Sequence, residues 1–289
     1  MLIQSIINGL AMGSVYALIS MGLTIIFGVM KLINFAQGEC LMLGMYATWV
    51  LQRATGLTPY QLIIPVLIVM FIIGQLVYFL FIDPLIGRPG TDFMVVTMGV
   101  AMVMVSIVQL LFSPTYQSVI SDIRDVAVKI GSDFAVGLPR VIAAGVLVLV
   151  VIVIQLLLQK TDFGRAMRAT AENKEVAQML GINTLKTFSL SFTLGVMLAG
   201  LCGLLLSPIY YTFPNVGMPF KTIAMVIVVL GGLGSIEGAV ICGMLAGIAE
   251  AMLGAYFSPD IAPAGIYALL ILVLFFKPHG LFGKVARKA

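Results

Sequence analysis

The sequence predicts an all-α protein that crosses a membrane several times. Of its 289 residues, 61% are hydrophobic and only 10% are charged, and the mean hydropathy is +1.14. Several apolar runs reach the roughly 20 residues that an α-helix needs to cross a bilayer. A membrane β-barrel would instead alternate apolar and polar residues in segments of about 10, and the sequence shows no such alternation. We therefore expect eight or nine transmembrane helices, some short or broken, in a single domain covering residues 1–289.

Nine segments are candidates for these spans. They lie near residues 5–30, 37–52, 61–83, 93–112, 137–159, 187–212, 220–234, 237–257 and 263–277. The second and seventh are shorter than a full crossing. Either could be a half-span or a re-entrant piece, which is why the count stays at eight or nine.

The distribution of basic residues predicts the orientation, because cytoplasmic loops carry an excess of lysine and arginine. If the loop 160–184 is cytoplasmic, 11 of the 16 basic residues fall on its side of the membrane. The other five are Arg53, Arg124, Lys129, Arg140 and Lys221. The N-terminus is then outside and the C-terminus is cytoplasmic. The polar segment 113–137 becomes the one long outer loop, and it could meet a partner outside the membrane or simply connect two spans.

The loop 160–184 itself predicts an amphipathic helix. A carboxylate at Asp162 could cap the helix, and Gly181 could end it, with Asn183 or Thr184 capping the next span. On a helical wheel the apolar stripe is narrow and consists mostly of small residues, and the polar face carries three basic and two acidic residues. The stripe residues are Ala166, Ala169, Asn173, Val176, Ala177 and Leu180.

Such a helix could lie on lipid or dock to a protein. A lipid-bound helix usually carries bulky apolar residues on one face and basic residues on the other. Small residues and mixed charge instead suit close packing against protein, so we expect a cytoplasmic partner here. The residues expected to make this contact are Arg165, Arg168, Glu172, Glu175, Ala177, Leu180 and Gly181.

Several kinds of chemistry lack the necessary residues. Cys40, Cys202 and Cys242 lie in or beside apolar runs, at spacings that suit neither a metal site nor a disulfide framework. A membrane-embedded enzyme would need a nucleophile with a base or a metal cluster, and the one histidine, His279, lies in the C-terminal tail. The net charge of +4 is spread over loops and predicts no nucleic-acid partner.

Four stretches resemble a known family. Glu175-Val176-Ala177-x-x-x-Gly181 is similar to the E-A-A-x-x-x-G loop of ABC importer permeases, with valine in place of the middle alanine. The stretches 9–39, 231–243 and 277–283 resemble the opening and closing segments of branched-chain amino acid permeases of the LivH type. That family often has histidine where Gln37 stands.

The resemblance implies a transport subunit without catalytic activity of its own. It implies two cytoplasmic ATPase subunits that hold ATP and Mg²⁺, a second permease chain, related and not identical, and an extracytoplasmic substrate-binding protein. The location implied is the inner membrane of a prokaryote. The sequence agrees in one respect, because it contains no G-x-x-x-x-G-K-[ST] loop to cradle phosphates. This chain therefore needs no cofactor of its own, and the ATPases would act through the helix in 160–184.

Polar groups inside the apolar spans are candidates for a substrate path or gate. Glu250 shares a helix face with small residues, and it could line the path or be a hydrogen-bonded structural group. The remaining candidates sit at two glycine-containing breaks between spans, where interrupted helices can border a path. These residues are Asn34, Gln37, Glu39, Ser235 and Glu237. On the predicted topology both breaks lie toward the cytoplasm, as an inner gate would, and tight turns without a substrate role are the alternative.

The expected substrate is a branched-chain or similar small neutral amino acid. Permeases for urea, amides or other small organic solutes are an alternative within the same class. A self-sufficient ion-coupled carrier using Glu250 is a further alternative, although it would need ionisable residues in several spans.

Overall fold

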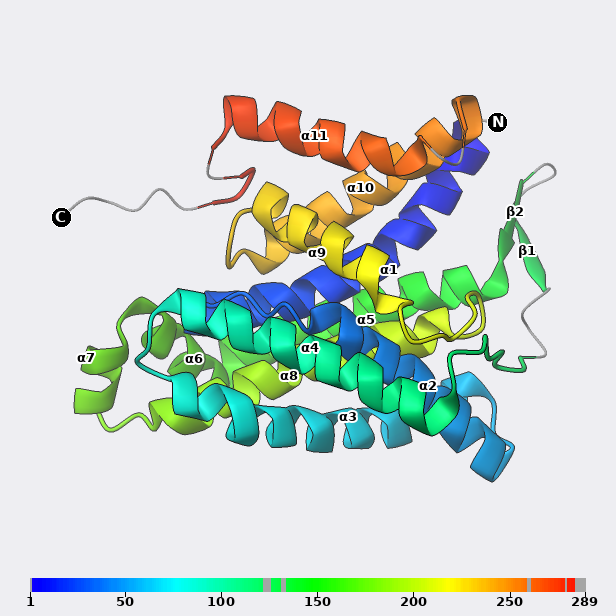
Figure 1. Ribbon diagram of the computed structural model, residues 1–289. Coiled ribbons are helices and arrows are strands. Elements are labelled where there is room, and N and C mark those ends of the chain that lie inside the picture. The colour runs from blue at the N-terminus through cyan, green and yellow to red at the C-terminus, as the bar shows by residue number, and fades with distance from the viewer. Residues whose placement is uncertain (1, 122–125, 131–133, 259–260, 279, 284–289) are drawn as a thin grey trace.

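The computed structural model is a bundle of helices with one short hairpin (Figure 1). It describes residues 2–121, 126–130, 134–258, 261–278 and 280–283. Two predictions fall partly or wholly on other residues: part of the loop 113–137, and the C-terminal tail with His279, lie outside the described residues.

Nine apolar helices of the described part coincide with the nine predicted segments. They are α1 (Leu2–Met30), α2 (Gln37–Thr55), α3 (Ile63–Val77), α4 (Gly90–Phe112), α5 (Leu138–Lys160), α8 (Thr184–Leu206), α9 (Gly217–Gly231), α10 (Ile236–Tyr256) and α11 (Ala262–Phe276). Short turns extend α3 at both ends: η1 (Pro59–Leu62), η2 (Tyr78–Ile82) and η3 (Asp83–Leu85). In the described part of the chain, six helices are long and apolar enough to cross a membrane: α1, α3 with its extensions, α4, α5, α8 and α10. The apolar helices α9 and α11 are shorter.

The remaining elements lie at opposite ends of the bundle (Figure 1). At one end are two short helices, α6 (Asp162–Glu172) and α7 (Lys174–Met179). At the other end the strands β1 (Ala127–Ile130) and β2 (Phe134–Gly137) pair antiparallel, with Ala127 opposite Gly137. The sequence pattern had predicted only a loop at this position.

The centre of the bundle is formed by α1 and α8. In each of them 83% of the most apolar window is buried, compared with 17% in α5. The long apolar side chains of α5 therefore face outward, as expected for a helix that meets lipid or another subunit.

Small residues allow the central helices to pack backbone to backbone. A side-chain carbon at Gly44 of α2 would lie 2.3 Å from the carbonyl oxygen of Gly200 in α8. A side-chain carbon at Gly247 of α10 would lie 2.4 Å from the α-carbon of Gly13 in α1. Helices in a membrane gain little from apolar burial alone, so this close van der Waals packing carries much of their association.

The chain returns to the bundle after α11. The backbone N–H groups of Leu281 and Phe282 donate hydrogen bonds to the carbonyl oxygens of Leu230 and Gly231, over 2.9 Å and 3.1 Å. These two bonds fasten residues 281–282 to the end of α9.

Candidate functional site

The segment between α5 and α8 is helical, as predicted, but it is broken into two helices. The N-cap of α6 is Thr161, whose hydroxyl accepts a hydrogen bond from Gly164 N over 3.1 Å. The prediction that Asp162 caps this helix was therefore wrong, and Asp162 is its first residue. Asn173 then leaves helical geometry, and its side-chain oxygen accepts from Val176 N over 3.1 Å. Because asparagine is a strong N-cap, it ends α6 and starts α7 within a stretch that otherwise favours helix.

The end of α7 agrees with the prediction. Gly181 has φ +82°, a left-handed conformation that glycine adopts without strain. Ile182 N donates to Ala177 O and Gly181 N to Gln178 O, each over 3.0 Å, which is the paired bond pattern of a Schellman motif. Asn183 caps α8 by accepting from Lys186 N over 3.0 Å.

The break changes which residues face outward. On α6 the buried residues are Gly164, Met167 and Thr170. On α7 two residues that the helical wheel placed on the same apolar stripe lie on different sides, because Ala177 is 1% exposed whereas Leu180 is 75% exposed. The structure thus places Ala177 against the bundle and removes it from the predicted docking surface. One helical wheel drawn over the whole segment gave the wrong face for α7, because the chain leaves helical geometry at Asn173 and α7 starts in a new orientation.

One side of α7 is tied to α8. The Lys174 ammonium lies 5.7 Å from the centre of the Phe188 ring, and Gln178 Nε2 donates to Thr184 Oγ1 over 2.8 Å. Val176, Met179 and Leu180 lie on the opposite side and are exposed. We call these three residues the α7 patch.

Charged side chains accompany the α7 patch. Arg165, Arg168, Glu172 and Glu175 are all exposed. Arg165 forms an ion pair with Asp162, and Arg168 donates to the carbonyl oxygen of Leu158 at the end of α5. An exposed apolar patch with charged residues nearby is typical of a site for another protein.

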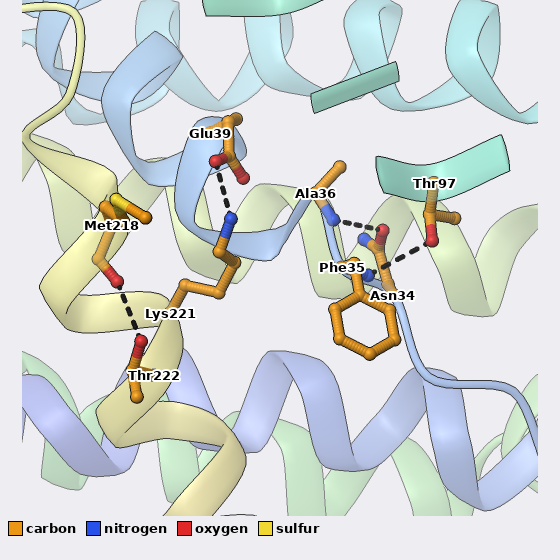
Figure 2. A network of polar contacts seen from close by, with 8 residues as sticks. All are labelled: Asn34, Phe35, Ala36, Glu39, Thr97, Met218, Lys221 and Thr222. Atoms are coloured by element: carbon orange, nitrogen blue, oxygen red, sulfur yellow. Dashed lines mark hydrogen bonds and ion pairs between the residues drawn. The ribbon is translucent and has the colours of Figure 1, made fainter. Parts of the chain in front are cut away.

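A second group of predicted residues lies where α1 gives way to α2 (Figure 2). Asn34 Oδ1 accepts from Ala36 N over 3.0 Å, and Asn34 Nδ2 donates to Gln37 Oε1 over 3.3 Å. Gln37 Nε2 in turn donates to Gly195 O of α8 over 3.2 Å. Both side chains are fully buried, and they hold the chain in shape at the break.

Glu39 has a different partner, which the sequence did not predict. Figure 2 shows Glu39 of α2 and Lys221 of α9 pointing toward each other, and Lys221 Nζ lies 2.8 Å from Glu39 Oε1. The predicted topology placed Lys221 on the outer side and Glu39 on the cytoplasmic side, so the structure corrects their relative depth. One feature of the sequence could have predicted this depth. The stretch 214–219 contains proline and glycine and precedes a short apolar segment, a pattern typical of a helix that begins within a bundle.

The second break lies elsewhere. Ser235 caps α10 by accepting from Gly238 N over 3.1 Å, and Glu237 in the first turn is exposed. Ser235 lies beyond Gly231, the last residue of α9, and the helix rises about 15 Å from Lys221 to Gly231 at 1.5 Å per residue. The two breaks therefore do not form one site.

Glu250 is a half-buried residue of α10. Its Oε2 accepts a hydrogen bond from the Tyr16 hydroxyl of α1 over 2.6 Å. The carboxyl group is thus turned toward another helix, as its small-residue face predicted.

The structure also contains a cavity that no sequence pattern indicated. It has a volume of about 470 Å³ and is lined by Trp49, Gln52, Arg53, Gly56, Leu57, Thr58, Gln117, Ser118 and Ile120. The Arg53 guanidinium lies 4.9 Å from the centre of a Trp49 ring. The cavity sits where α2 ends, at the hairpin end of the bundle and away from α6 and α7 (Figure 1).

Comparison with known families decides what kind of protein carries this geometry. The family model described as "Branched-chain amino acid transport system / permease component" matches residues 5–274. The chain belongs to this permease family. The match covers all nine apolar helices to within a few residues at each end, so family membership applies to the whole bundle.

Individual relatives agree. The permease is 33% identical to the high-affinity branched-chain amino acid transport system permease protein LivH of Salmonella typhimurium, over 98% of this chain and 96% of the relative. It is 30% identical to the corresponding permease protein BraD of Pseudomonas aeruginosa, over the same shares of the two chains. Among solved structures, PsaBC from Streptococcus pneumoniae in complex with Fab has a chain that aligns with a TM-score of 0.52, at 10% identity, covering 94% of this permease and 91% of that chain. That likeness shows a shared fold.

Proposed function

We infer that residues 1–289 form a single permease domain that acts as half of the path of an ATP-driven importer. The substrate proposed is a branched-chain or similar small neutral amino acid, as the names of the LivH and BraD relatives suggest. The importer would contain two ATPase subunits that supply ATP and Mg²⁺, a second, related but non-identical permease chain, and an extracytoplasmic binding protein. We place it in the inner membrane of a prokaryote, with the N-terminus outside and α6 and α7 in the cytoplasm.

The observation that carries this proposal is the α7 patch. Met179 and Leu180 are 84% and 75% exposed, on a helix whose opposite side is held against α8. Because both ends of α7 are capped, a force applied to the patch would reach α8 rather than unwind the segment. ATP-driven closure of the partner subunits could thus tilt the central helices and alternate access between the two sides.

The experiment is uptake by the reconstituted complex, with leucine as substrate. In the variant Leu180→Asp, a charge would replace the apolar contact, and the ATPase subunits should no longer copurify with the permease. The control Thr55→Ala changes an exposed residue at the end of α2, away from α6 and α7, and should leave copurification and uptake intact. Copurification and uptake by Leu180→Asp at the wild-type level would refute docking at the α7 patch.

The same preparation separates the alternatives. Uptake of urea or acetamide in preference to leucine would assign the permease to other small solutes. Uptake driven by an ion gradient without ATP would assign it to the ion-coupled carriers.

A further inference from the structure

The Glu39–Lys221 pair lies where two helices begin inside the bundle. Glu39 is the third residue of α2, and Lys221 is the fifth residue of α9. A side-chain carbon at Gly38 would lie 2.4 Å from Gly217 O, so the two helix starts touch backbone to backbone. In Figure 1, α9 begins between the α7 end and the hairpin end of the bundle. Substrate sites in transporters typically form at such interrupted helices.

Both charged groups retain unused binding capacity. Glu39 is only 7% exposed, and its Oε2 is buried without a hydrogen-bond partner among the described residues. A lysine ammonium can donate three hydrogen bonds, and the bond to Glu39 Oε1 uses one of them. The nearby polar groups are engaged elsewhere, since Thr222 donates to Met218 O and Asn34 bonds to Ala36 and Gln37.

Stability alone does not explain this pair. Removing two charges from water costs about as much as their attraction returns, and well-packed apolar residues often serve as well. Within the described chain this is the ion pair that joins two apolar helices, whereas Arg165 and Asp162 are exposed side chains of the same helix, α6. Charged groups retained at such a place call for a functional explanation.

The pair is also reachable from one side of α9. Met218, Lys221 and Thr222 share a helix face by their spacing, and Met218 is 64% exposed. The side chain of Lys221 keeps 20% of its surface exposed. The opposite face, with Ile223 and Ala224, is buried. A lysine and a threonine on a face turned to lipid would be costly, so this face suits the border of a polar path.

We propose that Glu39 and Lys221 form a binding station for a zwitterion. The α-ammonium group of an amino acid would bind the Glu39 carboxylate, including Oε2, and its α-carboxylate would bind the Lys221 ammonium. The ion pair opens to admit the substrate and closes behind it, so neither charge is left unpaired in the low-dielectric interior. This station rests on the proposed function, because it requires an amino acid as the transported solute.

The first test removes both charges together, which avoids leaving one buried charge alone. The complex carrying Glu39→Gln and Lys221→Gln is compared with wild type for leucine uptake in proteoliposomes and for ATP hydrolysis stimulated by the binding protein. We expect uptake per ATP hydrolysed to fall about tenfold or more. Stimulated hydrolysis should stay within about twofold of wild type. The matched control Thr48→Val alters another buried polar residue of α2 and should leave uptake per ATP unchanged.

The outcomes are distinct. Uptake by the double variant near the wild-type level would overturn the station while leaving the importer function intact. A parallel loss of uptake and stimulated hydrolysis would also overturn it, because the pair would then position helices rather than bind substrate. Failure of the wild-type complex to import leucine would remove the proposed function, and the station with it.

A second measurement does not depend on the variant folding. Radiolabelled leucine is bound to the unaltered complex without binding protein, and unlabelled competitors are added. Isoamylamine lacks the carboxylate and 4-methylpentanoate lacks the ammonium group, so neither should displace leucine, whereas unlabelled leucine should. Displacement by either analogue as effective as that by leucine, or no saturable leucine binding, would overturn the station.

Discussion

The Tyr16 hydroxyl donates a hydrogen bond to Glu250 Oε2 over 2.6 Å and thereby joins α1 to α10 inside the bundle. The Tyr16 ring also lies 6.3 Å from that of Phe220 in α9. A carboxyl group held by a donor from the central helix fits the structural role among the two roles predicted for Glu250.

The contact predicts a stability loss in Tyr16→Phe. Without its donor, the half-buried Glu250 carboxyl group would lose a hydrogen bond, which costs about 1 kcal/mol. Thermal unfolding of the detergent-purified permease should therefore begin at lower temperature. Tyr46→Phe is the matched control, because the buried Tyr46 hydroxyl has no hydrogen-bond partner among the described residues. Wild-type stability of Tyr16→Phe with a loss of uptake would instead assign Glu250 to the path.

The backbone contact between α1 and α10 predicts sensitivity to bulk. Gly247→Val places a side chain where Gly13 already lies, and overpacking of this kind costs about 1–3 kcal/mol. The fraction of permease that stays monodisperse after detergent extraction should fall. Gly99→Ala serves as control, since a side-chain carbon there has open space within the described chain. Equal behaviour of the two variants would contradict the close packing of α1 and α10.

The cap at Asn173 predicts local fraying of α7. In Asn173→Ala, Val176 N loses its acceptor, at a cost of about 1 kcal/mol, and α7 should open more often. Trypsin cleavage after Lys174 in the isolated permease should then be faster by about fivefold. Asn173→Asp keeps a capping oxygen and should restore slow cleavage. Unchanged cleavage of Asn173→Ala would mean that the cap does not hold α7.

The arrangement of the two ends predicts a labelling pattern. Cys40, Cys202 and Cys242 are all buried, so the wild-type permease should react slowly with maleimides. In intact cells an impermeant maleimide should label Ser118→Cys near the hairpin. Asp162→Cys in α6 should react only after the membrane is permeabilised. The reverse pattern would invert the proposed orientation.

Hydropathy predicted the nine apolar helices because apolar runs must be helical in a bilayer, whatever their partners are. Local chemistry also predicted the Gly181 stop, and it gave Asn183 as one of two candidates for the cap of α8. The break at Asn173 was missed because a residue that caps one helix can also sit inside another, and only the backbone geometry separates the two cases. The Glu39–Lys221 pair was missed for a different reason. The depth at which a short helix begins depends on tertiary packing, here on Gly38 against Gly217, and a loop-by-loop count of charges assumes full crossings.

The bonds from residues 281–282 to Leu230 and Gly231 tie this short segment to the end of α9. If α9 tilts when the Glu39–Lys221 pair opens, residues 281–282 should move with it. Phe282 is 41% exposed, so a fluorophore introduced there could report the motion of α9 from outside the bundle. The position of one tail residue would then report, in real time, each turnover of a path that lies inside the bundle.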